Sequence, residues 1–132
     1  MGWTTPKDWG SETLASADMD TYLSDNTAFL KANIALETFV ELTIDTGAVT
    51  KTKSLHDVDT EDDDATDDLD TINGGSEGDL LILRAEHTDR TIVIKNGTGN
   101  IDCDADITLD TTSKFAVLIY DGTSWQKLAS RA

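Results

Sequence analysis

The feature that most constrains the fold of this chain is a strict alternation of apolar and polar residues between positions 101 and 110. Apolar residues occupy every odd position from Ile101 to Leu109, and Asp or Thr occupies every even position from Asp102 to Asp110. Successive side chains of a β-strand point to opposite faces, so this pattern predicts a strand with one buried face and one solvated face. Cys103 falls on the apolar face, and we interpret it as a small buried hydrophobic residue.

Further runs of β-branched and aliphatic residues predict a mainly β domain over residues 37–132. Besides the strand at 101–109, strands are expected at 39–44, 49–55, 80–83, 91–95, 115–120 and 125–128. No helical pattern separates the later strands, which favours a compact antiparallel β domain over a βαβ fold. We expect a β-sandwich, a barrel or a short intertwined β-prism.

Two dipeptides and one internal echo bear on how these strands connect. Asn96-Gly97 and Asp121-Gly122 accept positive φ and predict tight hairpin turns. Residues 92–98 resemble residues 117–123 at an offset of 25 positions, as if one strand-turn unit were used twice. Two copies are too few to establish a solenoid.

Residues 1–36 are expected to form a separate segment for attachment or oligomerisation. An extended arm over 1–13 precedes a helix over about 16–33, in which Ser16 is a suitable N-cap and acidic residues occupy the first turn. The candidate interface consists of the tryptophans of the arm and apolar residues at helical spacing: Trp3, Trp9, Met19, Tyr22, Leu23, Phe29 and Leu30. The tryptophans either anchor the arm on a neighbouring protein or fold back onto the same chain.

The charge balance excludes several classes of partner. The chain has 26 acidic and 10 basic side chains, a formal charge of −16. Such a chain lacks the basic face that nucleic-acid binding needs, and anionic lipid is disfavoured for the same reason. No apolar run approaches the roughly 18 to 20 residues of a transmembrane helix. No secretory signal is evident at the N terminus, so the chain is expected to stay in the cytoplasm or to enter a particle.

The acidity is mainly aspartate, with 20 Asp and 6 Glu. Carboxylates dispersed over a surface suit concentrated salt, where the Debye length falls to about 3 Å at 1 M and self-repulsion is screened. We therefore expect a salt-loving host. The alternative is a local acidic segment in an ordinary mesophilic protein.

The densest acidic segment, residues 56–70, has the partial spacing of a calcium loop. Carboxylates stand at five EF-hand ligand positions: Asp57, Asp59, Glu61, Asp63 and Asp68. Asp62, however, stands where such a loop requires Gly, and flanking helices are not evident. We favour a solvated acidic loop or strand edge. Nothing in the sequence places Cys103 or a serine beside His56 or His87, so we predict no enzyme, no catalytic residue, no cofactor and no metal site.

Several segments together cover most of the chain and share one resemblance. They include LASADMDTYLSDN at 14–26, ATDDLDTINGG at 65–75, TIVIKNGTGNI at 91–101 and IYDGTSW at 119–125. In these segments the chain resembles small structural proteins of tailed bacteriophages and archaeal tailed viruses. They are patterns of a structural module and contain no catalytic constellation.

The resemblance implies a β-rich unit that assembles as a homotrimer and is displayed on the virion. It implies as partners copies of the same chain and other virion proteins, such as the major capsid protein or tail proteins, with synthesis in the host cytoplasm. A chain of 132 residues has little room for an attachment domain, a shaft and a receptor-binding tip together. We therefore expect a capsid decoration or head-fibre protein.

Two other functions stay open. The first is a tail fibre or baseplate component that binds a host glycan or surface protein, which exposed aromatic residues around Tyr120 and Trp125 would favour. The second is a small acidic Ca²⁺-dependent binding module or carbohydrate-active enzyme, which requires bound metal or a carboxylate-lined cleft.

Overall fold

The chain from Thr38 to Ala132 is described by a computed structural model, and it consists of short strands joined by tight turns. The elements are β1 (Val40–Thr43), β2 (Ala48–Thr50), β3 (Leu55–Asp59), the 3₁₀ helix η1 (Glu61–Asp63), β4 (Thr66–Leu69), β5 (Thr71–Asn73), β6 (Leu80–Ala85), β7 (Thr91–Ile94), β8 (Ile101–Asp102), β9 (Ile107–Leu109), β10 (Phe115–Tyr120) and β11 (Trp125–Arg131). Within this part of the chain, no helix has the length and hydropathy needed to cross a bilayer.

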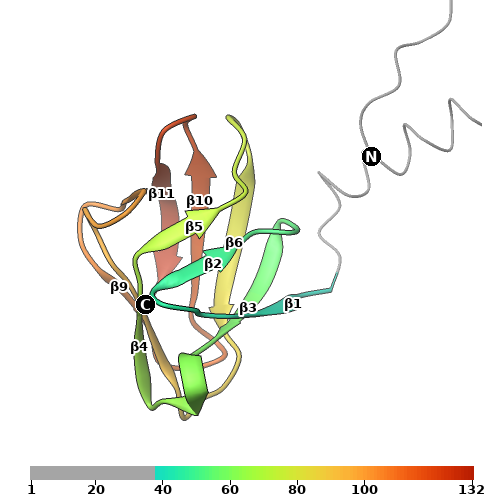
Figure 1. The fold of residues 1–132 in the computed structure, drawn as a ribbon, viewed down its shortest axis with the longest axis vertical. Coiled ribbons are helices and arrows are strands. Elements are labelled where there is room, and N and C mark those ends of the chain that lie inside the picture. The colour runs from blue at the N-terminus through green and yellow to red at the C-terminus, as the bar shows by residue number, and fades with distance from the viewer. Residues whose placement is uncertain (1–37) are drawn as a thin grey trace, which may run out of the picture. The chain divides into compact units, whose positions relative to one another are not determined.

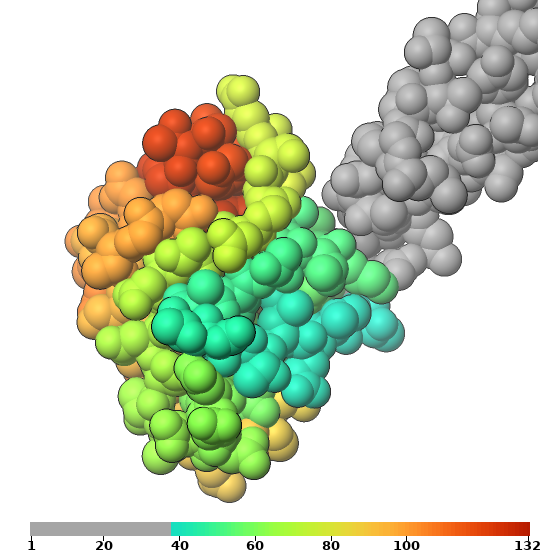
Figure 2. All heavy atoms as spheres, in the orientation of Figure 1, coloured from blue at the N-terminus to red at the C-terminus, as the bar shows by residue number. Residues whose placement is uncertain are grey.

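The chain winds into about three turns of a β-solenoid, in which strands from successive turns stack in parallel. β1, β3 and β6 stack in sheet A, β2 and β5 form sheet B, and β4 and β7 stack in sheet C. Figure 1 shows β2 and β5 in front of the strands of sheet A. In the space-filling view the segments that contain β2 and β5 lie side by side on one face (Figure 2).

The mainly β prediction is confirmed, but the prediction of an antiparallel sandwich, barrel or prism is wrong. Stacked positions lie about one solenoid turn apart along the chain, as in the pair Leu69 and Ile94 of sheet C. The echo between residues 92–98 and 117–123 does not mark such a turn, because β7 lies in sheet C and β10 lies in sheet A. The offset therefore matched the turn length without identifying stacked strands.

The last third of the chain reverses direction and closes one end of the stack. β9 pairs antiparallel with β7, β10 pairs antiparallel with β6, and β11 pairs antiparallel with β10. Beside β5 there is no third strand of sheet B among residues 38–132, and the side chain of Asn100 takes its place. Its amide oxygen accepts from the Ile72 N–H at 2.9 Å, and its amide nitrogen donates to the Ile72 carbonyl at 2.8 Å.

The core lies between the three sheets and is almost entirely aliphatic. It consists of Ile44, Val49, Val58, Leu69, Ile72, Leu81, Leu83, Ala85, Ile92, Ile94, Ile101, Cys103, Ile107, Leu109, Ala116, Leu118 and Trp125. Gly99, with φ of 53°, passes so close to β5 that a Cβ atom would lie 2.2 Å from the Asp70 carbonyl oxygen. Only glycine permits this approach.

The strand predictions hold where apolar runs are long and fail in three places. The strands at 39–44, 80–83, 91–95, 115–120 and 125–128 are present as β1, β6, β7, β10 and β11. The strand at 101–109 is divided into β8 and β9, because Asp104 has a positive φ of 66° and Ala105 is exposed. The strand at 49–55 is interrupted after Thr50, and β3 begins only at Leu55.

The acidic segment at 56–70 is the third place, since three strands that the alternation did not predict lie within it or next to it. These are β3, β4 and β5, and β4 is an edge strand of sheet C, in agreement with the strand-edge interpretation. Of the two predicted hairpins, the one at Asp121-Gly122 joins β10 to β11 as expected. The one at Asn96-Gly97 is wrong, because β7 and β8 do not pair and the Asn96 side chain accepts from the Cys103 N–H.

Candidate functional site

The outer side of sheet A is apolar along β6 and β10, although the rest of the chain is strongly acidic. Along β6 and β10, buried inward residues alternate with residues that point away from the core. The outward residues face each other across the two strands, Leu80 beside Ile119 and Ile82 beside Val117. Leu128 is the extra residue of a β-bulge in β11 and is 57% exposed. We call this surface the outer face, defined by Leu80, Ile82, Phe115, Val117, Ile119 and Leu128.

One end of the outer face carries an arginine that is held by two contacts. The Arg84 guanidinium makes a bidentate pair with Asp57, at 2.7 and 2.9 Å, and lies 4.1 Å from the ring centre of Phe39. Bidentate pairing and stacking on an aromatic ring both fix the plane of the guanidinium. Burial and the negative charges of Asp57 and Glu41 raise the pKa of the neighbouring Glu86 carboxyl above its ordinary value. This end of the face is therefore polar but internally paired.

The carboxylates of the acidic segment point to different partners instead of converging on one centre. Asp57 binds Arg84, Asp59 and Asp63 both bind Arg90, and a carboxylate oxygen of Glu61 accepts from the Thr46 N–H at 2.9 Å. Asp68 lies on the exposed side of β4. No group of three or more His, Cys, Asp or Glu side chains in residues 38–132 is arranged to hold a metal ion. The EF-hand spacing in the sequence thus does not produce a ligand cluster here.

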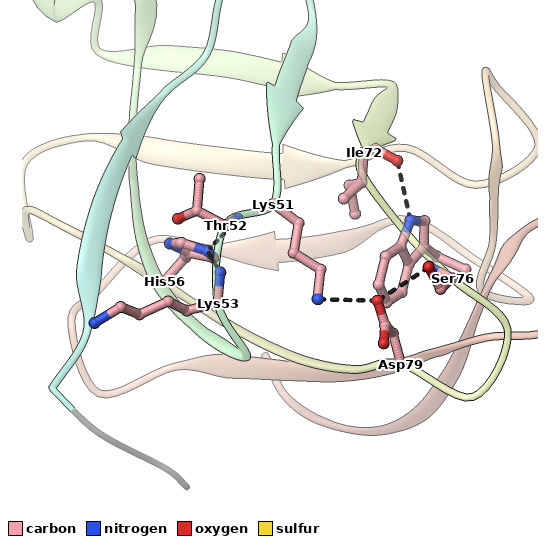
Figure 3. A network of polar contacts seen from close by, with 8 residues as sticks. Lys51, Thr52, Lys53, His56, Ile72, Ser76 and Asp79 are labelled. Carbon is pink, nitrogen blue, oxygen red and sulfur yellow. Dashed lines mark hydrogen bonds and ion pairs between the residues drawn. The ribbon is translucent and has the colours of Figure 1, made fainter. Parts of the chain in front are cut away.

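His56 is fully buried behind sheet A and is bonded through both ring nitrogens. Its Nδ1 lies 2.7 Å from the Val40 carbonyl oxygen, and its Nε2 accepts from the backbone N–H groups of Thr52 and Lys53 at 3.1 and 3.0 Å (Figure 3). An Nε2 that accepts two hydrogen bonds carries no proton, so the ring is neutral and Nδ1 donates to Val40. Burial is the main cause that lowers the pKa of His56. The ring joins β1 to the turn before β3 and is a structural group.

A second polar contact in the same region fixes the loop between β5 and β6. The Lys51 ammonium lies 3.0 Å from a carboxylate oxygen of Asp79, which also accepts from the Ser76 N–H (Figure 3). Nearby, the indole N–H of Trp125 donates to the Ile72 carbonyl at 3.0 Å. These contacts tie successive solenoid turns together.

The side chains considered for nucleophilic chemistry lie apart. Cys103 is buried in the core, where burial raises its pKa to about 11. A thiol with that pKa stays protonated near neutral pH and is a poor nucleophile. His87 is exposed in the turn between β6 and β7, and both ring nitrogens of His56 are bonded to backbone groups. The structural interpretation of Cys103 is confirmed.

The aromatic residues named for a glycan site do not form an exposed cluster. Trp125 is fully buried, and Tyr120 packs against the core with its ring centre 5.1 Å from that of Trp125. Gly75 leaves room for both rings, because a Cβ there would lie 2.9 Å from the indole. The aromatic pair therefore closes the core beside β11.

The predicted helix over 16–33, the arm and the seven candidate interface residues from Trp3 to Leu30 lie outside the described residues. The outer face was not among the predicted sites, although β6 and β10 contain a signal for it. Leu80 to Leu83 and Phe115 to Tyr120 are apolar at every position, without the alternation of a half-solvated strand. Such runs are typical of strands covered on both faces.

Comparison with known proteins adds no relative to this description. No family model matches the chain, and no match was found among curated proteins or solved structures.

Proposed function

We propose that this chain is a non-enzymatic structural protein of a virus particle. In this proposal it is a capsid-surface decoration or head-fibre protein, which assembles as a homotrimer and stabilises or ornaments the capsid. The resemblance of the sequence to structural proteins of tailed viruses supports a place in the virion. The contrast between the apolar outer face and the acidic remainder of the surface supports attachment through one side of the molecule.

The observation that carries the proposal is the contrast between an apolar outer face and carboxylates over the remaining surface. Apolar area left in water costs about 25 cal/mol per Å² relative to burial, so a face of this kind favours a covered state. Exposed acidic faces keep their hydration and repel other acidic particles. A protein with both properties is suited to a fixed place on a larger assembly, with one side covered and the other in solvent.

The chemistry of the buried polar groups also supports a structural role. His56 through its Nδ1, Asn100 and Trp125 direct polar atoms to backbone groups of neighbouring solenoid turns. Their hydrogen bonds satisfy the edges of the short strands, which would otherwise leave buried donors and acceptors unpaired. These hydrogen bonds therefore stabilise the fold.

Location on the particle is the test of the proposal. Purified virions are labelled with a gold-tagged antibody fragment raised against residues 38–132 and imaged by electron cryomicroscopy. Label at regular positions over the capsid is the expected result. Label confined to the tail end would replace the proposal with the tail fibre or baseplate function, and unlabelled particles would overturn a virion role.

Molecular mass provides an independent test of the assembly. Light scattering on the full chain, in low salt and in multimolar salt, is expected to give three times the 14.3 kDa of one copy. The mass of a single copy under both conditions would contradict the homotrimer, since the copies would then stay apart whether or not salt screens their charges.

A further inference from the structure

We infer that the outer face of sheet A is the surface through which copies of this chain contact one another. This inference rests on the proposed homo-oligomer and names the part of the molecule that forms it. The occupant of the face is a second copy, which contributes the same apolar residues.

The face combines apolar side chains with real exposure to solvent. Leu80 is 37% exposed, Phe115 is 36% exposed and Leu128 is 57% exposed, and they are the large hydrophobic residues that the structure leaves exposed within residues 38–132. All three lie on adjacent strands of sheet A. Large apolar residues that gather on one face mark interaction sites more reliably than scattered ones.

The size of the face is sufficient for the centre of an interface. Six residues of β6 or β10 extend about 20 Å, and the three adjacent strands of the face span roughly 10 to 15 Å. The projected area is then about 200 to 300 Å², close to the size of the largest apolar patch on a typical monomer, which is often a functional one. A stable contact buries about 800 Å² per partner, so polar residues around the face would form the rim.

Charge selects a second copy over an unlike partner. Residues 38–132 contain 20 acidic and 8 basic side chains, so two copies repel each other wherever carboxylates face carboxylates. The outer face avoids this repulsion, because Arg84 is its charged residue on β6 and β10 and is already neutralised by Asp57. A basic partner would instead gain most by binding the acidic surfaces. The face thus fits a partner that is itself acidic and has an apolar patch, as a second copy does.

The end of the outer face near Phe115 also favours a contact between copies. Arg131 pairs in register with Phe115 at the end of β11, and Arg84 pairs in register with Phe115 from the other side. Phe115 therefore lies between two arginine positions of the strand register at one end of the face. In a contact between copies, the exposed Arg131 is available to the carboxylates that surround the partner's face, whereas Arg84 stays paired with Asp57.

Matched substitutions test the inference in the full chain. Phe115→Glu places a charge on the outer face, and Thr108→Glu places the same charge at an exposed position of β9 in sheet C. We expect Phe115→Glu to weaken self-association roughly 30-fold or more, the effect of losing a central interface residue, and to move the scattering mass toward one copy. Thr108→Glu is expected to keep the wild-type mass. Circular dichroism reports whether each variant is folded.

A spin label provides a measurement that does not depend on a disruptive charge. Labels at Leu128→Cys and at Thr108→Cys are compared for accessibility to a water-soluble relaxant, while buried Cys103 remains unreactive. In the assembled protein the Leu128 label should be several-fold less accessible than the Thr108 label, and dilution to single copies should remove the difference.

The outcomes separate the inference from the proposed function. An oligomer that Phe115→Glu leaves intact and folded, or a Leu128 label as accessible as the Thr108 label, overturns the inference and leaves the homo-oligomer standing. A Leu128 label that stays protected in single copies also overturns it, because the face is then covered by the chain's own residues. A wild-type chain that is monomeric at all salt concentrations overturns the homo-oligomer itself.

Discussion

Sheet A and sheet C bury their inner sides in the same core but differ on their outer sides. Outward positions of sheet A on β6 and β10 hold Leu, Ile, Val and Phe, with Arg84 as the exception. Outward positions of sheet C hold Thr66, Asp68 and Thr108, with Val93 between them. A shared core therefore does not explain the apolar outer side of sheet A. Packing within a single copy therefore gives no reason for the outward residues of β6 and β10 to be apolar.

The difference also shows where the negative charge of the molecule is placed. Carboxylates occupy the wet side of sheet C, the turns, and the strands β1 and β3 of sheet A, whereas the outer face on β6, β10 and β11 carries none of its own. Repulsion between copies is thereby directed to one part of the surface and attraction to another. Apolar and acidic surfaces are therefore separated in space on one solenoid.

The largest expected effect on stability comes from shortening a buried side chain on the inner side of either sheet. Leu118 of β10 and Leu109 of β9 are fully buried, so Leu118→Ala and Leu109→Ala should each lower the free energy of unfolding by about 2 to 5 kcal/mol. Chemical denaturation followed by circular dichroism measures both. Thr108→Ala, on the solvated side of β9, is the control and should change stability by less than about 0.5 kcal/mol. A small effect at only one of the leucines would show that the two sheets do not share one core.

The apolar runs were sufficient to predict most strands but not their stacking. Phe115 to Tyr120 and Thr91 to Ile94 are continuous enough that a strand was the expected structure for each. Whether two strands pair in parallel or antiparallel is decided by the course of the chain between them, which a local pattern does not contain. The 25-residue turn is visible in the register of Leu69 and Ile94, yet only once the strands are placed.

The strands of the acidic segment were missed because their partners are remote in sequence. Asp57 and Asp59 are tolerated in β3 since Arg84 and Arg90, about one solenoid turn later, pair with them. The buried residues between the carboxylates are few, and local alternation around Val58 and Leu69 is weak. Asn96-Gly97 failed for a related reason, because its side chain bonds to Cys103 in place of forming a hairpin.

The second expected effect is a pH dependence from the inner side of sheet A. Because His56 is held neutral in the fold, its pKa there lies below the value of 6.5 that applies in the unfolded chain. Below pH 6.5 the unfolded chain binds a proton that the folded chain does not, so falling pH destabilises the fold. The free energy of unfolding should decrease as pH falls, with a slope that approaches about 1.4 kcal/mol per pH unit below pH 6.5 and ends at the lowered pKa.

Denaturation between pH 7.5 and 5.5 measures this slope, and substitution of each histidine assigns it. His56→Gln should be less stable at pH 7.5 and should lose the slope. His87→Gln removes an exposed imidazole and should retain it. If His87→Gln flattened the profile instead, the buried neutral ring would not be its source. Glu86, whose pKa is raised in the fold mainly by burial, contributes in the opposite direction and is present in both variants.

The smallest expected effect compares one charge on each outer side. Asp57→Asn, on sheet A, leaves the Arg84 guanidinium without its bidentate partner and should cost about 1 kcal/mol, a value reduced because Arg84 is 36% exposed. Asp68→Asn, on the exposed side of sheet C, should change stability by less than about 0.5 kcal/mol. Denaturation in low salt and in 1 M salt distinguishes the two, because screening over about 3 Å removes the exposed contribution first. Equal losses at both positions, persisting in 1 M salt, would mean that the carboxylates of the two sheets have the same structural role and that sheet C is not simply a solvated face.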